Sequence, residues 1–345
     1  MTTRVRFGVI GASGIADRRT MPAFKQTQHC ELTAVCSRSP DRARTLAAKH
    51  GATHGFTDIQ SLLSCDAVEA VYVASPVHLH LEHALAVAGS GKHLLLEKPL
   101  ARTVPEAEEL LAAVKRTRIL AMEAYMMKFH PAHVDIRNRV QAGHLGRIVY
   151  ARARLGCWYP DDPQAWRQNP QLGGGGALID IGSHLLDLFI WMLGPIEKIT
   201  SLHNTQVFHY QSEDSATALV QFTSGTHGII ESFFSLPDAL GVGELELLGT
   251  RGSVKAAGTI GQAGGGRLEW RSGPAQTAYD ARQEAPPSEF HTHAQTCDET
   301  NLYAAQLDYF AGCIQENRTP EINRIQDGLE ILRWINRAYK NGNRS

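Results

Sequence analysis

Four polar side chains recur along residues 177–193, an otherwise apolar segment that the sequence predicts to be a buried helix. They are Asp180, Ser183, His184 and Asp187, and spacings of three, four and seven residues place them on one helix face. Because an unpaired polar group is costly to bury, this stripe needs partners or a water-filled cleft. An acid and a histidine so placed suit proton transfer in an active site, although a structural Asp–His pair fits the same pattern.

A glycine run, Gly173–Gly176, precedes this helix. Glycine has no side chain, so the backbone there can approach a ligand closely, which favours the catalytic interpretation. Asp187 lies one turn deeper than His184 and is expected to be structural. Asp180 and His184 alone are too few ligands for a metal centre, so no metal site is predicted.

A second candidate site is a glycine turn between a predicted strand at residues 5–10 and the helix after it. Gly11, Ser13 and Ala16 occupy the three key positions of the G-x-G-x-x-G/A pattern. Backbone N–H groups at such a helix start favour the pyrophosphate of a dinucleotide. A tight turn without a ligand fits this degraded pattern too, but its place at the start of a strand–helix alternation favours a cofactor. The predicted contacts are Gly11, Ser13, Gly14 and Ile15.

The end of the second predicted strand, residues 31–36, indicates which nicotinamide cofactor is used. Ser37 and Arg38 follow this strand, and Arg42 lies one helical turn further on. NAD sites usually place an acidic residue here to hold the ribose 2′-hydroxyl. A hydroxyl and a guanidinium suit a 2′-phosphate, which predicts NADP. The alternative is that both arginines are simply solvated, so NAD remains possible.

Alternation of strand-like and helix-like segments fills the first third of the chain and predicts a parallel sheet covered on both faces. Strands are expected at 5–10, 31–36, 67–74, 93–96 and 119–124, and helices at 43–50, 79–88 and 104–115. Later segments are expected to be helices at 131–141, 177–193, 303–316 and 326–339, a strand at 148–155, a strand meander over 196–268 and a loop at 271–299. The predicted fold class is α/β. A Rossmann dinucleotide-binding domain (1–124) precedes an α+β domain (125–345) for substrate binding and oligomerisation. The second domain has a large, mostly antiparallel open sheet, and its last helix packs back on the first domain.

Composition narrows the class of partner. A chain of 345 residues suits two domains, and a net charge of −1 argues against nucleic acid or an anionic membrane as the main partner. No secretory leader or transmembrane helix is expected, because the most apolar stretch, 185–193, is short. The six cysteines form no Cys-x-x-Cys pair, which argues against a disulfide framework and suits a reducing cytoplasm.

The segment Lys92–Leu100, with Glu97-Lys98-Pro99, resembles the Gfo/Idh/MocA family of sugar and cyclitol oxidoreductases. The resemblance covers nearly the whole chain and is carried by several further motifs. These are the opening Gly8-Val9-Ile10-Gly11, Ser75-Pro76 with His80, Trp166-Arg167, the glycine run with Asp180 and His184, and the closing Asp327-Gly328-Leu329. Gly11-Ala12-Ser13 is similar to NADPH-dependent keto-sugar and anhydrosugar reductases. Residues 123–131 resemble the dihydrodiol/xylose dehydrogenase and keto-sugar reductase branches.

The resemblance implies hydride transfer between nicotinamide and a hydroxyl or keto carbon of a sugar-like molecule. His184 is expected to exchange the hydroxyl proton, Asp180 to orient the sugar, and Lys98 to stabilise the developing alkoxide. Lys98 follows the strand at 93–96, at the sheet edge where open α/β sheets bind ligands, although a surface lysine in a turn fits as well. The Lys98–Pro99 bond is expected to be cis. The resemblance also places residues near the cofactor: Ser75, Pro76, His80, Glu97, Trp166 and Arg167.

Two other functions stay open. One is an NAD-dependent polyol, cyclitol or aminoglycoside-sugar dehydrogenase. The other is a non-catalytic nucleotide-sensing regulator, against which the joint presence of Lys98, Asp180 and His184 argues. We expect a cytoplasmic homodimer or homotetramer with a sugar-like substrate and with no nucleic-acid or membrane partner. Which sugar is used, and in which direction, does not follow from these residues.

Overall fold

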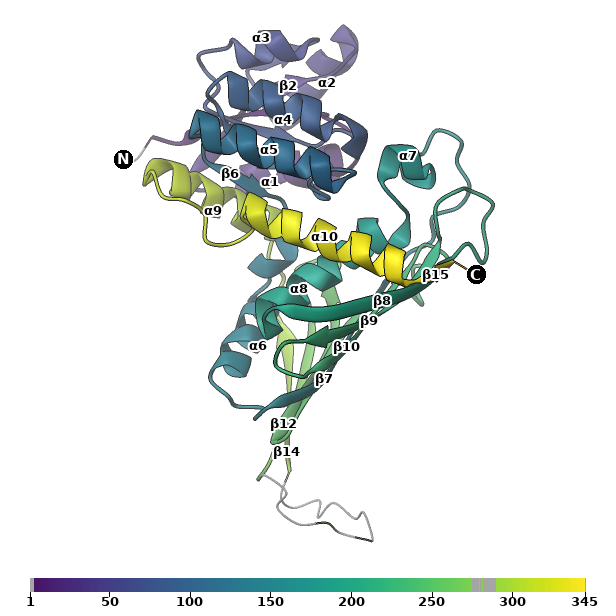
Figure 1. Ribbon diagram of the computed structural model, residues 1–345. Coiled ribbons are helices and arrows are strands. Elements are labelled where there is room, and N and C mark those ends of the chain that lie inside the picture. Colours follow the sequence, from purple (N-terminus) through teal and green to yellow (C-terminus); the bar gives the residue numbers. More distant parts are fainter. Residues whose placement is uncertain (1–2, 275–278, 280, 282–289, 345) are drawn as a thin grey trace. The chain divides into compact units, whose positions relative to one another are not determined.

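The computed structural model describes residues 3–274, 279, 281 and 290–344, and the chain divides into two compact units (Figure 1). The first unit comprises Met1–Met126, Asn169–Gly174 and Asn301–Arg333. The second unit comprises Met127–Gln168, Gly175–Thr300 and Trp334–Ser345. The final helix, α10 (Ile325–Asn341), therefore begins in the first unit and ends in the second.

The first unit contains a parallel sheet of six strands in the order β3-β2-β1-β4-β5-β6. The strands are β1 (Val5–Ile10), β2 (Cys30–Cys36), β3 (His54–Phe56), β4 (Ala70–Val73), β5 (His93–Leu96) and β6 (Ala121–Glu123). This strand order is that of a Rossmann fold, which confirms the predicted class and puts the order reversal between β1 and β4. Nearly every residue of β1, β4 and β5 is buried, as in a parallel sheet covered on both faces.

Most helices of the first unit begin at a residue whose side chain caps them. Ser39 accepts a hydrogen bond from the N–H of Arg42 at the start of α2, and Thr103 does the same for Glu106 at the start of α5. The helices are α1 (Met21–Ala23), α2 (Pro40–His50), α3 (Ile59–Leu63), α4 (His80–Gly89), α5 (Val104–Thr117), α7 (Pro170–Gly173) and α9 (Leu302–Gln315). The shorter turns are η1 (Ala16–Thr20), η2 (Phe24–Gln26) and η3 (Val77–Leu79).

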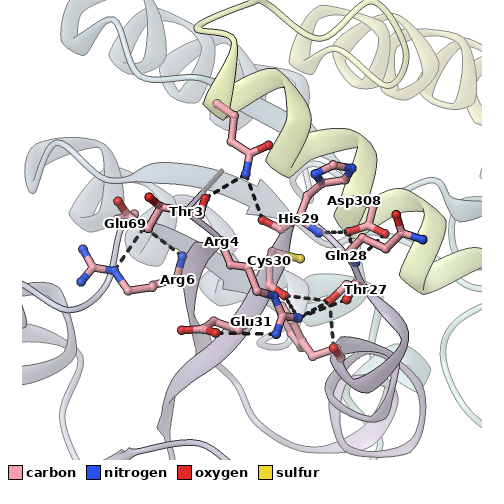
Figure 2. A network of polar contacts seen from close by, with 12 residues as sticks. Thr3, Arg4, Arg6, Thr27, Gln28, His29, Cys30, Glu31, Glu69 and Asp308 are labelled. Atoms are coloured by element: carbon pink, nitrogen blue, oxygen red, sulfur yellow. Dashed lines mark hydrogen bonds and ion pairs between the residues drawn. The ribbon is translucent and has the colours of Figure 1, made fainter. Parts of the chain in front are cut away.

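Helix α9, late in the sequence, is fastened to the first strands of the chain. Figure 2 shows Asp308 of α9 beside the backbone of the turn before β2, where its carboxylate accepts the N–H groups of Gln28 (2.9 Å) and His29 (2.8 Å). Gln315, at the end of α9, donates to the carbonyl of Thr3 at 2.9 Å. A helix from the far end of the chain therefore packs on β1 and β2 of the six-stranded sheet.

The second unit contains a sheet of nine strands in the order β14-β13-β12-β11-β7-β10-β9-β8-β15. Its pairs are antiparallel except β7–β10 and β8–β15, which confirms a large, mostly antiparallel sheet. The strands are β7 (Ile148–Gly156), β8 (Ile196–Asn204), β9 (Ser215–Phe222), β10 (His227–Phe233), β11 (Gly243–Gly249), β12 (Gly252–Ile260), β13 (Gly266–Ser272), β14 (His291–Cys297) and β15 (Asn343–Arg344).

One face of this sheet is covered by helices and the other is open. The π-helical turn η6 (Leu178–Gly182) and helix α8 (Ser183–Leu193) pack on the central strands, and α6 (Pro131–Gln141) packs on β12. The remaining short turns are η4 (Met126–Phe129) and η5 (Trp166–Gln168). On the open face Leu202, Leu219 and Leu248 keep 65%, 53% and 39% of their surface exposed.

Three expectations about local structure were wrong. Residues 54–56 form a strand, β3, that the sequence pattern did not reveal. Part of the loop expected at 271–299 is strand β14, which pairs antiparallel with β13, while residues 275–278, 280 and 282–289 lie outside the described residues. The helix expected over 177–193 is interrupted, because its first turn, η6, is π-helical.

The apolar stretch before β8 is mostly interior. By length and composition alone Pro170–Leu193 could cross a membrane, since an 18-residue window within it has a mean hydropathy of 1.5, but 72% of that window is buried inside the fold. All six cysteines have free thiols.

Candidate functional site

The glycine turn after β1 has a shape that only glycine permits. Gly11 has φ +79°, and a Cβ there would lie 2.4 Å from the backbone nitrogen of Ser75. Gly14 has φ +52° and open space where its Cβ would be. The N-cap residue of η1 is Ile15, whose apolar side chain accepts no hydrogen bond from the N–H groups that follow it. The first N–H groups of η1 therefore suit an anion, and the turn fits a dinucleotide pyrophosphate.

The turn after β2 presents two cationic side chains to solvent. The N–H of Ser37 donates to the carbonyl of Phe56 at 3.0 Å, so the missed strand β3 holds this turn in place. Arg38 and Arg42 are both exposed, and within the described chain neither forms an ion pair. A pair of exposed guanidinium groups beside a serine hydroxyl fits a 2′-phosphate better than a bare 2′-hydroxyl.

Two histidines of α4 hold the turn after β4. The ring of His80 lies between two backbone carbonyls: its Nε2 is 2.9 Å from Ser75 O and its Nδ1 is 2.9 Å from Pro99 O. The Nδ1 of His83 lies 2.9 Å from Ser75 Oγ. Burial lowers the pKa of His80 to about 4, so its ring is neutral near pH 7 and donates to one carbonyl at a time. His80 thus ties the turn after β4 to the turn after β5.

Lys98 follows β5, in a segment fixed by the buried carboxylate of Glu97. Tyr72 donates its hydroxyl to Glu97 Oε1, and Glu97 Oε2 accepts the backbone N–H of Lys98 at 3.2 Å. Thr20 in turn donates to Tyr72 at 3.1 Å. The Lys98–Pro99 bond is cis, as expected. These contacts fix the backbone of Lys98 at the carboxyl end of the sheet, where α/β folds bind their ligands.

In the second unit, Asp180 is paired with Arg167. Asp180 Oδ1 lies 3.1 Å from Arg167 Nε, and the guanidinium carbon lies 4.1 Å from the centre of the Trp166 ring. Burial alone would lower the pKa of Arg167, but the negative charge of Asp180 more than compensates and raises it. Tyr159 contacts the same guanidinium, and burial raises the pKa of its hydroxyl, which therefore stays protonated. Asp180 is accordingly a fixed carboxylate with its charge balanced.

His184 and Asp187 lie on α8, both buried. Asp187 Oδ1 is 2.6 Å from Lys128 Nζ, and the two side chains keep only 2% and 5% of their surface exposed. Asp187, expected to be structural, is thus half of a buried ion pair. Asp180 itself lies in the π-helical turn η6, directly before α8, and such turns are frequent at functional sites.

The structure adds residues that the sequence patterns did not single out. Lys128 pairs with Asp187 from a segment distant in sequence, and Tyr159 contacts Arg167 from the loop just before it. For Lys128 a signal existed, since a lysine inside the apolar segment 124–129 needs a buried partner. Over the described ranges, His, Cys, Asp and Glu side chains form no group of three able to hold a metal ion.

Comparisons with known proteins match the two halves of the chain to the two domains of one protein family. Residues 5–125 match the model of the oxidoreductase family with an NAD-binding Rossmann fold, and residues 133–255 match that of the GFO/IDH/MocA C-terminal domain. Oxidoreductase P35 of Formosa agariphila is 31% identical over 263 residues, 74% of this chain and 79% of that protein. The 1,5-anhydro-D-fructose reductase of Ensifer adhaerens is 28% identical, over 95% of this chain and 93% of that protein. Among solved structures, the aldose–aldose oxidoreductase of Caulobacter crescentus complexed with glycerol is 26% identical, covers 98% of this chain and 97% of its own, and has a TM-score of 0.84.

Proposed function

The chain belongs to the GFO/IDH/MocA family of NAD(P)-dependent oxidoreductases, and from this membership we propose that it moves a hydride between NADP(H) and a hydroxyl or keto carbon of a sugar. The observation that carries the proposal is the open glycine turn at the start of η1, in a sheet with Rossmann strand order. The sugar as substrate is supported by the relatives named above, which act on an anhydro-keto-sugar and on aldoses.

Three side chains are assigned to the chemistry. When bound, NADPH supplies the hydride that reduces the keto carbon. Lys98, whose backbone Glu97 fixes, stabilises the alkoxide oxygen with its ammonium charge. His184 delivers the proton that turns the alkoxide into a hydroxyl, and takes it back in the reverse direction. Asp180 orients the sugar by accepting a hydroxyl hydrogen bond, and the ion pair with Arg167 holds its carboxylate in place.

The preference for NADP rests on the turn after β2. Arg38 and Arg42 offer two cationic groups, and no acidic residue stands at positions 37 or 38 to hold a free 2′-hydroxyl. We also propose that the protein is a cytoplasmic homodimer or homotetramer. Free thiols support a reducing compartment, and the open apolar face of the second sheet supports self-association.

Cofactor titration followed by turnover tests the proposal. Quenching of tryptophan fluorescence by NADPH and by NADH would give the two dissociation constants, and tighter NADPH binding is expected. Consumption of NADPH at 340 nm with 1,5-anhydro-D-fructose, and formation of NADPH from NADP+ with aldoses, would then give the direction. Tight NADH binding together with oxidation of polyols would instead support the NAD-dependent polyol dehydrogenase. Binding without turnover of any sugar would support a nucleotide-sensing regulator.

A further inference from the structure

The start of the helix that carries Asp180 and His184 is capped by a residue from a different part of the second unit. The carboxylate of Glu213 accepts the N–H of Gly176 at 2.9 Å and the N–H of Leu178 at 3.0 Å. The backbone carbonyl of Glu213 accepts the N–H between them, that of Ala177, at 3.0 Å. Ala177 is the N-cap of η6 and has no side chain able to cap it. One residue therefore binds three successive N–H groups of this helix start.

Tyr339, near the end of α10, completes this arrangement. Its hydroxyl donates to Glu213 Oε1 at 2.6 Å, the same oxygen that accepts the N–H of Leu178. Burial and the charge of Glu213 raise the pKa of Tyr339 well above its ordinary value, so its hydroxyl remains a donor. Glu213 keeps only 5% of its surface exposed, and burial raises the pKa of its carboxyl group. Three donors thus satisfy a carboxylate that is costly to bury.

The contact with Glu213 and Tyr339 requires glycine at positions 175 and 176, just before the helix. A Cβ on Gly175 would lie 2.3 Å from the hydroxyl oxygen of Tyr339, and a Cβ on Gly176 would lie 2.0 Å from the carbonyl oxygen of Glu213. Ser212 also donates to the carbonyl of Gly175, at 3.3 Å. The close approach that glycine allows here is therefore made by the protein's own residues.

We infer that the Glu213–Tyr339 pair is a positioning device that sets the place of Asp180 and His184 for the reaction. The inference rests on the proposed function for the roles of those two residues. Leu178, which Glu213 holds, begins η6, and Asp180 follows two residues later on the same turn. A helix moves as a rigid element, so a displacement at Leu178 reaches both side chains. A misplacement of about 1 Å at a reacting group costs roughly a hundredfold in rate.

Two nearly isosteric substitutions test the inference without creating a cavity. Tyr339→Phe removes only the hydroxyl, and Glu213→Gln replaces one accepting oxygen by an NH2 group that cannot accept. With the sugar that the wild-type enzyme turns over fastest, each variant is expected to lower kcat by about tenfold or more. The dissociation constant for NADPH, which binds the first unit, is expected to stay within twofold of wild type. The double variant should have the kcat of Glu213→Gln alone, because the two groups act through one contact.

Asp214→Asn is the matched control. Asp214 is also a buried carboxylate that accepts three backbone N–H groups, but they belong to the neighbouring loop: Gln206, Val207 and Phe208. Asp214→Asn is expected to destabilise the fold about as much as Glu213→Gln does, and to leave kcat within about twofold of wild type. Urea midpoints would establish that every variant is folded in the assay. Unchanged kcat in both Tyr339→Phe and Glu213→Gln, or an equal loss in Asp214→Asn, would overturn the inference.

A readout without turnover separates this inference from the proposed function. The imidazole of His184 can be observed by NMR in the enzyme alone, its signals assigned by their absence in His184→Gln. Tyr339→Phe is expected to shift the ring signals of His184, because its surroundings move with η6, whereas Asp214→Asn leaves them unchanged. Wild-type inactivity on every sugar would refute the proposed function. An unshifted His184 in Tyr339→Phe would refute the positioning role, with or without a known substrate.

Discussion

The buried ion pair between Lys128 and Asp187 yields a quantitative prediction. At an effective dielectric constant of about 20, charges 2.6 Å apart attract by about 6 kcal/mol. Removing two ions from water costs several kcal/mol each, so the pair adds little net stability. Breaking it is different, because the buried carboxylate of Asp187 then loses its counter-charge. Lys128→Met is therefore expected to lower the free energy of unfolding by about 3–5 kcal/mol.

Urea unfolding followed by circular dichroism measures this loss. The double variant Lys128→Met with Asp187→Leu is expected to recover most of it, because no unpaired charge remains. Arg333→Ala is the matched control: Arg333 and Glu108 also lie 2.6 Å apart, but their side chains are 55% and 50% exposed. This substitution should cost less than about 1 kcal/mol. A loss for Lys128→Met as small as that of the control, or a double variant no better than the single one, would refute the reasoning.

Three further predictions concern chemistry, cofactor choice and pH. Lys98→Met and His184→Ala should each lower kcat steeply in protein that urea unfolding shows to be folded, and unchanged turnover in both would refute their assignment. Arg38→Ala should weaken NADPH binding by about tenfold or more and leave NADH binding unchanged by fluorescence titration, since a charged hydrogen bond contributes about 1.5–3 kcal/mol; equal weakening of both would contradict the 2′-phosphate role. His80 has a pKa of about 4 in the folded protein against 6.5 ordinarily, so the unfolded chain takes up its proton first and stability falls by about 3 kcal/mol as pH drops from 6.5 to 4. His80→Gln should reduce the dependence of the urea midpoint on pH between pH 6.5 and pH 4, and an unaltered dependence would contradict the prediction.

Much of the fold follows from local patterns in the sequence. Strands β1 and β5 and helix α6 begin and end at the predicted residues, because apolar runs and turn residues mark their limits. Strand β3 gives no such signal, since its three residues His54-Gly55-Phe56 are held by pairing with β2. Strand β14 is polar along its length and exists because β13 supplies its hydrogen-bond partners. Both strands form because they pair with another segment of the chain, and a short window of sequence does not contain both partners.

The motif residues of the candidate site could be predicted from the sequence, but the residues that hold them in place could not. Lys98, Asp180 and His184 stand in patterns that the sequence displays directly. The role of Glu213 is not visible in the sequence, because a glutamate in the polar stretch 211–214 looks like any solvated residue until Gly176 and Tyr339 are brought beside it. The π-helical turn also escaped prediction, since the apolar spacing of a π-helix and of an α-helix agrees over so few residues.

The distance along the chain between Gly176 and Tyr339 has a consequence for synthesis of the protein. The two residues are 339 − 176 = 163 positions apart. At about 5–20 residues per second, a ribosome needs roughly 8–33 s to add Tyr339 after Gly176 has been made. Until Tyr339 has been added, the Glu213 carboxylate that caps the start of the helix after Gly176 lacks the hydroxyl donor of Tyr339. A chaperone that shields this helix during translation would act on the segment that carries Asp180 and His184, the residues proposed to take part in the reaction.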